Sequence, residues 1–239
     1  MSTYVYGIAR STHPSPPQQL GGVGDPPQPV RALRQGRLMA LVSDAPENLR
    51  PKRRDLLAHQ QVLRAAGAQG TVLPLRFGGL SPDDETLAAV LAEREDHYLE
   101  RLRALDGKSE YNVKASHDEQ SVLRLVLADD PELRAMAEAG RSGGDGGAYE
   151  GKLQLGERIA NAVRLREAQD ADLLRETLKG PAEAVSAGPQ STGWLTNLSF
   201  LVDGEHIAEF VAAVESVREE QPHLVLTVTG PLPPYSFVE

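Results

Sequence analysis

The sequence contains no cysteine. This absence excludes disulfide bonds, a catalytic thiolate and every metal site that depends on cysteine ligands. Long apolar runs are also missing, and no stretch approaches the roughly 18 apolar residues that a membrane-spanning helix requires. The opening residues, MSTYVYGIAR, show no basic region followed by a long apolar stretch, which argues against a secretory signal. We therefore expect a soluble, cytoplasmic protein without a membrane span.

Basic residues are outnumbered, with 25 Lys and Arg against 34 Asp and Glu, and the net charge of −9 disfavours non-specific binding to nucleic acid. The imbalance is confined to one half. Residues 1–107 carry 13 basic and 12 acidic side chains, whereas residues 108–239 carry 12 and 22. Chance surface composition is one explanation, but such asymmetry also indicates two units with different roles. We expect an N-terminal domain at 1–107 and a C-terminal domain at 108–239 that includes a tail, 231–239.

The first half has the pattern of a small α+β layer. Tyr4, Tyr6 and Ile8 alternate in a manner typical of one face of a strand. Pro74 interrupts the apolar stretch 71–79, which places that predicted strand at a sheet edge or at a bulge. The remaining elements predicted here are strands at 30–33 and 37–42, a helix at 51–67 and a single helix from about 81 to 105.

The second half repeats the mixture of strands and helices with more helical material. The predicted order is a strand at 109–115, helices at 117–127, 131–139 and 149–179, two strands within 181–204, a helix with an apolar stripe over 207–217, and a strand at 224–230. This order is that of a ferredoxin-like fold with extra helices after its first strand: one strand, helices, two strands, a helix and a last strand. The overall fold class is therefore α+β in two domains. The fold alone implies no function.

Motifs that could support catalysis fail when their context is considered. Gly140 to Gly144 match G-x-S-x-G, but a nucleophile elbow needs a strand before the serine and a helix after it, and here a helix is predicted before Ser142. The six histidines never pair at helical metal-site spacing. The glycines of LGGVGD lie in a proline-rich loop, without the spacing of a phosphate-binding loop. The histidines considered are His13, His59, His97, His117, His206 and His223. We expect no catalytic, cofactor-binding or metal-binding residues in this sequence.

One strand face offers an alternative. Alternation from Lys108 places Lys108, Glu110, Asn112 and Lys114 on the same face of a strand. A solvated strand face is the simpler interpretation, while a buried Lys-Glu-Lys set would be a candidate for ligand binding or catalysis. The alternative function is thus a ferredoxin-like small-molecule-binding or catalytic protein that uses Lys108, Glu110 and Lys114.

Four strings resemble the gas vesicle protein F/L family: VLPLRFGGL (72–80), GKSEYNVKA (107–115), LGERIANAV (155–163) and the terminal TGPLPPYSFV (229–238). They occur in the order of that family, and the opening YVYGIA also fits, so the resemblance spans the chain. It implies a non-enzymatic accessory protein of gas vesicle formation, without cofactors, which binds the very hydrophobic shell protein and is a minor vesicle component. It also implies two domains, the second a modified ferredoxin-like one, and partners among the other accessory proteins of the vesicle.

The terminal string is itself unusual, because soluble chains commonly end in polar, mobile residues. Pro231, Pro233 and Pro234 favour an extended polyproline-II conformation with little entropy left to lose on docking. Tyr235 and the apolar residues around it can then fill a groove, either in the same molecule or in a partner. A permanently exposed apolar tail promotes aggregation, so we expect the groove to be internal.

Overall fold

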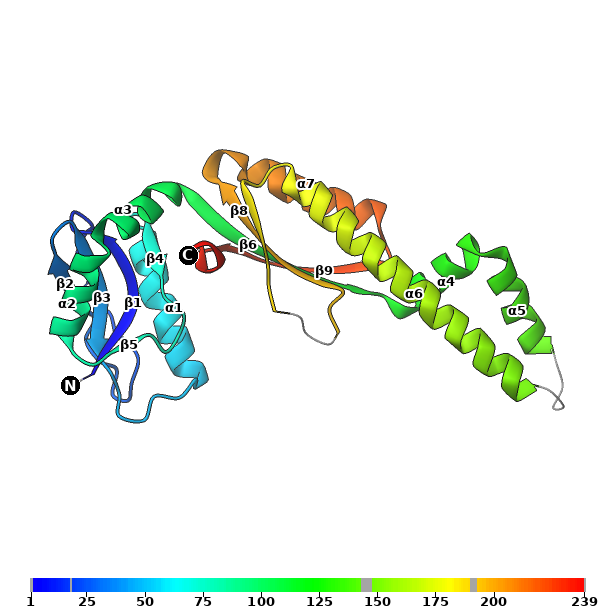
Figure 1. Cartoon of the computed structure of the whole chain (residues 1–239), viewed down its shortest axis with the longest axis horizontal. Helices are drawn as coiled ribbons and strands as arrows, with labels where there is room; N and C mark the ends of the chain where they lie inside the picture. Colours follow the sequence, from blue (N-terminus) through cyan, green and yellow to red (C-terminus); the bar gives the residue numbers. More distant parts are fainter. Residues whose placement is uncertain (1, 18, 143–147, 190–192, 239) are drawn as a thin grey trace. The chain divides into compact units, whose positions relative to one another are not determined.

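The computed structural model describes residues 2–17, 19–142, 148–189 and 193–238 (Figure 1). The chain forms two compact units. Unit 1 combines Met1–Glu110 with Pro231–Glu239, and unit 2 consists of Tyr111–Gly230. The chain therefore leaves unit 1 after Glu110 and returns to it after Gly230. Among the described helices, none is long and apolar enough to cross a membrane.

Unit 1 is built on an antiparallel sheet with β1 (Thr3–Arg10) inside it (Figure 1). The strand order is β2-β3-β1-β4, and β5 pairs with β1 as well. The short β4 ends this order and contains Pro74, as expected for a strand that lacks one ladder donor. The other strands are β2 (Arg31–Gln35), β3 (Leu38–Asp44), β4 (Val72–Pro74) and β5 (Leu80–Ser81).

A bulge in β1 changes which of its side chains share a face. The pairing with β3 shifts between Val5 and Gly7, and a bulge reverses the side-chain alternation that follows it. Tyr4 and Tyr6 consequently share a core cluster with Ala9, and Ile8 is not part of that cluster. The predicted face of Tyr4, Tyr6 and Ile8 was wrong in its last member for this reason.

The helices of unit 1 are α1 (Arg53–Gly67), α2 (Asp84–Glu93) and α3 (Glu95–Ala104). A single helix was predicted where α2 and α3 lie, but Arg94 leaves the helical conformation between them. Glu95 accepts hydrogen bonds from the backbone N and Nε of Arg37, both at 2.7 Å, which ties the start of α3 to the β2–β3 turn. This tertiary contact has no counterpart in the local apolar pattern.

Unit 2 contains a four-stranded sheet whose order is β7-β8-β6-β9 (Figure 1). Its strands are β6 (Lys108–His117), β7 (Ala184–Ala187), β8 (Thr196–Asp203) and β9 (Leu224–Leu232), and β6 and β9 also carry the chain across the two unit boundaries. Its helices are α4 (Glu119–Asp129), α5 (Pro131–Ser142), α6 (Ala148–Lys179) and α7 (Ile207–Glu220).

The core of unit 2 lies between this sheet and the helices α6 and α7. Leu174 and Leu178 of α6 and Phe210 of α7 pack against side chains of β6, β8 and β9. The elements follow one another as expected for a ferredoxin-like fold with added helices, and two helices share one core with the sheet. The mixed α+β class is confirmed, while a ferredoxin-like second domain remains a prediction that this order supports.

The division into domains at 107/108 also remains a prediction. One part of it needs correction, because the tail 231–239 was assigned to the second domain and groups with unit 1 instead. The tail groups with unit 1 because its contacts lie there: with Glu110, the last residue of β6 in unit 1, with Arg101 of α3, and with the core cluster of unit 1.

Candidate functional site

The tail is held in unit 1 by a buried carboxylate. Glu110 is only 4% exposed, and its two oxygens accept hydrogen bonds from the backbone N of Ser236 at 2.8 Å and from the Ser236 hydroxyl at 2.9 Å. Arg101 of α3 donates a further hydrogen bond to the backbone oxygen of Phe237. The tail, with its short 3-10 turn at Tyr235–Phe237, thus meets a charged acceptor and a charged donor in the same molecule.

Apolar contacts complete this site. Tyr235 packs against the core cluster that contains Tyr4 and Tyr6. Burial, together with the nearby charge of Glu110, raises the pKa of Tyr235 to about 12. Of the tail side chains, Pro234 is buried, whereas Leu232, Tyr235, Phe237 and Val238 are half-buried. The tail therefore docks within the same molecule, as expected from the sequence. Its aromatic side chains are half-buried and not fully buried.

Behind Tyr235 lies a buried network of aromatic and polar side chains. Nε2 of His59 donates to the backbone oxygen of Leu75 at 3.0 Å, because that oxygen can only accept. Nδ1 of His59 is then an acceptor, and the Tyr4 hydroxyl donates to it at 2.8 Å. Burial lowers the pKa of His59 and raises that of Tyr4, so both groups are held neutral.

The proline- and glycine-rich loop closes over this network. The backbone N of Val23 donates to the Tyr6 hydroxyl at 2.8 Å, and that of Gly24 donates to Asp55 at 3.0 Å. A Cβ on Gly22 would lie 2.1 Å from the Tyr6 oxygen, so only glycine fits there. These glycines allow close backbone packing and do not form a phosphate-binding loop.

The first two turns of helix α1 bury polar side chains and expose two leucines, whereas Val62, Leu63 and Ala66 further along the helix are buried in the core. Its buried face includes Asp55, 5% exposed, and His59, 2% exposed, both engaged in the network above. Leu56 and Leu57 point outward and are 37% and 54% exposed. A single exposed leucine is ordinary, but adjacent leucines outside a helix that buries an aspartate and a histidine mark a candidate contact surface.

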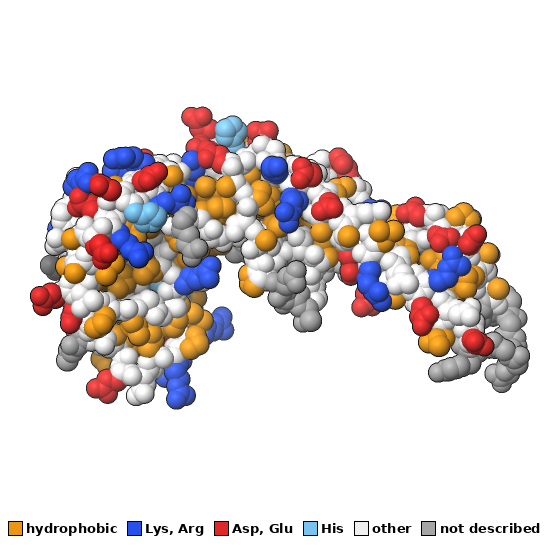
Figure 2. Space-filling view, in the orientation of Figure 1, with side chains coloured by type: hydrophobic (Ala, Val, Ile, Leu, Met, Phe, Trp, Pro, Cys, Tyr) orange, Lys and Arg blue, Asp and Glu red, His pale blue; other side chains and the backbone are white. Residues whose placement is uncertain are grey.

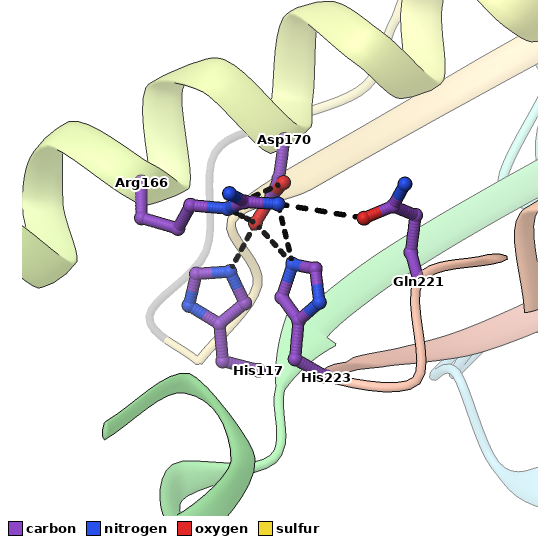
Figure 3. Close-up of polar contacts among 5 residues, drawn as sticks. All are labelled: His117, Arg166, Asp170, Gln221 and His223. Atoms are coloured by element: carbon purple, nitrogen blue, oxygen red, sulfur yellow. Dashed lines mark hydrogen bonds and ion pairs between the residues drawn. The ribbon is translucent and has the colours of Figure 1, made fainter. Parts of the chain in front are cut away.

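Unit 2 contains a second buried polar cluster, shown in Figure 3. Asp170 of α6 is almost fully buried and accepts hydrogen bonds from Nε2 of His117 and Nε2 of His223, each at 2.8 Å. Arg166, one turn earlier on α6, donates through Nε to both carboxylate oxygens at 3.0 and 3.1 Å. Burial by itself would raise the pKa of Asp170, but the hydrogen bonds from Arg166 and the two histidines outweigh it and lower the pKa.

The protonation of this cluster follows from its charges. An ionised carboxylate only accepts, so both Nε2 atoms must carry hydrogen. Nδ1 of His117 is the ring nitrogen that takes no part in this contact. That atom is buried and has no hydrogen-bond partner among the described residues.

The donor atoms of His117, Asp170 and His223 lie within 4.8 Å of one another, the spacing of a metal site. The residues around them fit a metal ion poorly. The guanidinium of Arg166 contacts both oxygens of Asp170, and its Nη2 lies 3.2 Å from Nε2 of His223. A bound cation would face this guanidinium directly, so Arg166 serves as the counter-ion of the cluster. The absence of metal ligands remains a prediction.

The strand face of Lys108, Glu110, Asn112 and Lys114 is neither a uniform solvated ladder nor a shared site. Glu110 binds Ser236, and Lys108 donates to the backbone oxygen of Ala104 at 2.8 Å. Asn112 donates to Asn197 at 2.9 Å, and Nζ of Lys114 lies 5.7 Å from the ring centre of Trp194. Each side chain thus has its own surroundings, which gives no support to a common Lys-Glu-Lys centre.

The remaining sequence candidates are placed as follows. Ser142 is the last residue of α5, so a helix precedes it, and Gly143 to Gly147 of the glycine-rich stretch lie outside the described residues. His97 and His206 are exposed, whereas His13, His59 and His223 are buried and His117 nearly so. No local spacing could have found the Asp170 cluster, because each of its histidines is 53 residues away from the aspartate.

Comparison with known proteins identifies the family. The family described as gas vesicle synthesis protein GvpL/GvpF matches residues 2–239. The chain belongs to the GvpL/GvpF family. It is 66% identical to gas vesicle protein F of Streptomyces sp. (strain CB03234), over the whole length of both chains. It is 27% identical to gas vesicle protein L of the same strain, over 98% of this chain and 91% of that protein.

Solved structures of the GvpL/GvpF family share this fold. The crystal structure of gas vesicle protein GvpF from Anabaena sp. PCC7120 is similar with a TM-score of 0.77 at 25% identity, over 100% of this chain and 98% of that chain. The family is thus one of gas vesicle formation, and its description names no enzymatic activity.

Proposed function

We propose that this chain is an accessory factor in gas vesicle assembly that binds the hydrophobic shell protein through the outer face of α1, and that it associates with gas vesicles. Membership of the GvpL/GvpF family supports the process. The first turns of α1 support the surface: Leu56 and Leu57 are exposed although the same turns bury Asp55 and His59. Leu56 and Leu57 could have packed in the core, and in this proposal they contact the shell protein instead.

The charge of unit 1 suits an apolar partner. Residues 1–107 are close to electrically neutral, with 13 basic and 12 acidic side chains. The free-energy cost of desolvating charges when an apolar protein docks is therefore lower there than on the acidic residues 108–239. In the view of Figure 2, hydrophobic side chains reach the surface of this unit between Lys and Arg side chains. Covering two partly exposed leucines is worth about 1.5–3 kcal/mol.

A double substitution tests the surface. Replacing Leu56 and Leu57 by Gln should weaken capture of co-expressed shell protein by about 10- to 100-fold, since each 1.4 kcal/mol is tenfold in affinity. Both positions are partly solvated, so the variant should fold normally. The matched control is Leu153→Gln on α6, which is also 54% exposed and should leave capture unchanged.

The result that contradicts the proposal is specific. Full capture by the folded double variant, together with loss in Leu153→Gln, would assign the shell-protein surface to unit 2. Full capture by both variants would remove the apolar-contact argument altogether.

A further inference from the structure

A groove of about 730 Å³ lies within unit 2, between α4, α6 and the segment that enters β8. Its walls include the apolar side chains of Val122, Val163 and Trp194. His117, a member of the Asp170 cluster, also lines it. The groove shares no lining residue with α1 or with the tail site, and the proposed function makes no use of it.

The imidazole of His117 lies at the border of the groove and is largely buried. The side chain is only 7% exposed, its Nε2–H is committed to Asp170, and its Nδ1 has no partner in the described part of the chain. In Figure 3 this second nitrogen is on the side of the ring away from Asp170 and His223. That nitrogen is fully buried, so a ligand in the groove would contact the charged side chains and the apolar walls and not this atom.

The charged side chains that line the groove favour a ligand that carries positive charge. Glu119 and Glu167 line it and can only accept hydrogen bonds while ionised. Among the described lining residues the cationic side chain is Arg164, which donates to Asn161 at 3.1 Å. Nζ of Lys114 already lies over the Trp194 ring, which shows that this ring accommodates a cation. The lining is therefore net negative, within a half of the chain that is itself acidic.

We propose that this groove binds a basic amphipathic segment of a partner protein. A lysine or arginine of that segment pairs with Glu119 and Glu167. A neighbouring apolar side chain of the segment packs against Val122, Val163 and Trp194. Charge complementarity selects the partner, and the apolar walls distinguish an amphipathic protein segment from a small polar cation.

Trp194 is a direct reporter, because it is the one tryptophan in the sequence. The full-length protein is titrated with a synthetic 14-residue peptide of Leu and Lys at helical spacing while the tryptophan emission is followed. We expect a saturable change in emission that weakens at high salt, since exposed charge pairs are screened. The same peptide with Glu in place of Lys should give no change, and spermidine should bind at least tenfold more weakly than the peptide.

Variants locate the binding. Glu119→Gln combined with Glu167→Gln should weaken the peptide by about fivefold or more, because two charge pairs are lost. Glu176→Gln, an exposed carboxylate elsewhere on α6, is the matched control and should change nothing. Ala168→Phe places a ring in the groove and should abolish the response while the Asp170 cluster stays intact.

Three outcomes overturn the proposal. No saturable change with the Leu-Lys peptide, or an equal one with its Glu counterpart, removes the basic segment as the occupant. Equal binding of spermidine assigns the groove to small polyamines. An unchanged response in folded Ala168→Phe places the peptide elsewhere on the acidic surface.

Discussion

Removal of the tail should destabilise unit 1 even when no partner is present. A chain that ends at Gly230 loses every residue from Pro231 onward, including the two groups of Ser236 that donate to Glu110. Glu110 would then be a buried carboxylate deprived of these donors, and Tyr235 would leave the cluster around Tyr4. Both changes act within one unit, so no assembly partner is needed to observe them.

The expected magnitude follows from these contacts. A buried acceptor that loses its donors costs about 1–3 kcal/mol, and uncovering the half-buried rings of Tyr235 and Phe237 adds about 1.5–3 kcal/mol. Conformational entropy released by the free tail offsets part of this, although the prolines restrict the unfolded segment already. We expect a net loss of about 2 kcal/mol, which for a chain of this size lowers the melting temperature by roughly 4–8 °C.

Thermal melting of the purified truncation decides the matter, with aggregation followed by light scattering. A matched pair of point variants isolates the carboxylate. Ser236→Ala removes a hydroxyl that bonds to buried Glu110, and Ser216→Ala removes an exposed hydroxyl that bonds to Glu220 at 2.8 Å. The first should cost about 1 kcal/mol and the second less than about 0.5. An unaltered melting midpoint in the truncation refutes internal docking and leaves the tail to a partner.

Most of the elements could be predicted because their periodicity is local. The apolar stripe of α7, with Phe210, Val214 and Val217 in the core, needs no knowledge of the rest of the chain. The same stripe also shows the limit of the method, since Val211 belongs to it and is 44% exposed. Apolar spacing identifies a helix, but its orientation depends on what lies opposite.

Where distant residues determine the structure, the sequence pattern was insufficient. At the break between α2 and α3, Glu95 contacts Arg37, 58 residues away, and the apolar pattern of the helices contains no sign of this contact. The inward face of α1 carries His59 because Tyr4 and the backbone of Leu75 supply its hydrogen-bond partners. Polar residues at core positions look like surface residues in a sequence, so the buried face of α1, which also carries Val62 and Leu63, could not be derived from the apolar residues alone.

The candidate sites illustrate the same limit. The tail was recognisable from its prolines and aromatics, but nothing in the sequence connects Ser236 with Glu110. In the Asp170 cluster the only local signal is the pair of Arg166 and Asp170 at i, i+4, which is common on helix surfaces. Asp170 is buried where the fold brings His117, at the end of β6, and His223, just before β9, against it.

Three further outcomes are expected. Ser142→Ala should leave gas vesicle formation intact, and loss of vesicles from a folded, normally expressed variant would contradict the non-enzymatic interpretation. Asp170→Asn should lower the free energy of unfolding by about 3 kcal/mol in urea titrations, because Arg166 is left without its counter-charge, whereas exposed Asp172→Asn should change it by less than about 0.5. Stability should also depend on pH through His59, whose pKa burial lowers below its ordinary 6.5. The unfolded chain then binds more protons between the two pKa values, so the stabilisation is complete above about pH 6.5 and declines as the pH falls below it. His59→Gln can accept from Tyr4 and donate to Leu75 without titrating, so it should flatten that part of the melting profile, and an identical acid slope in variant and parent would refute the assignment.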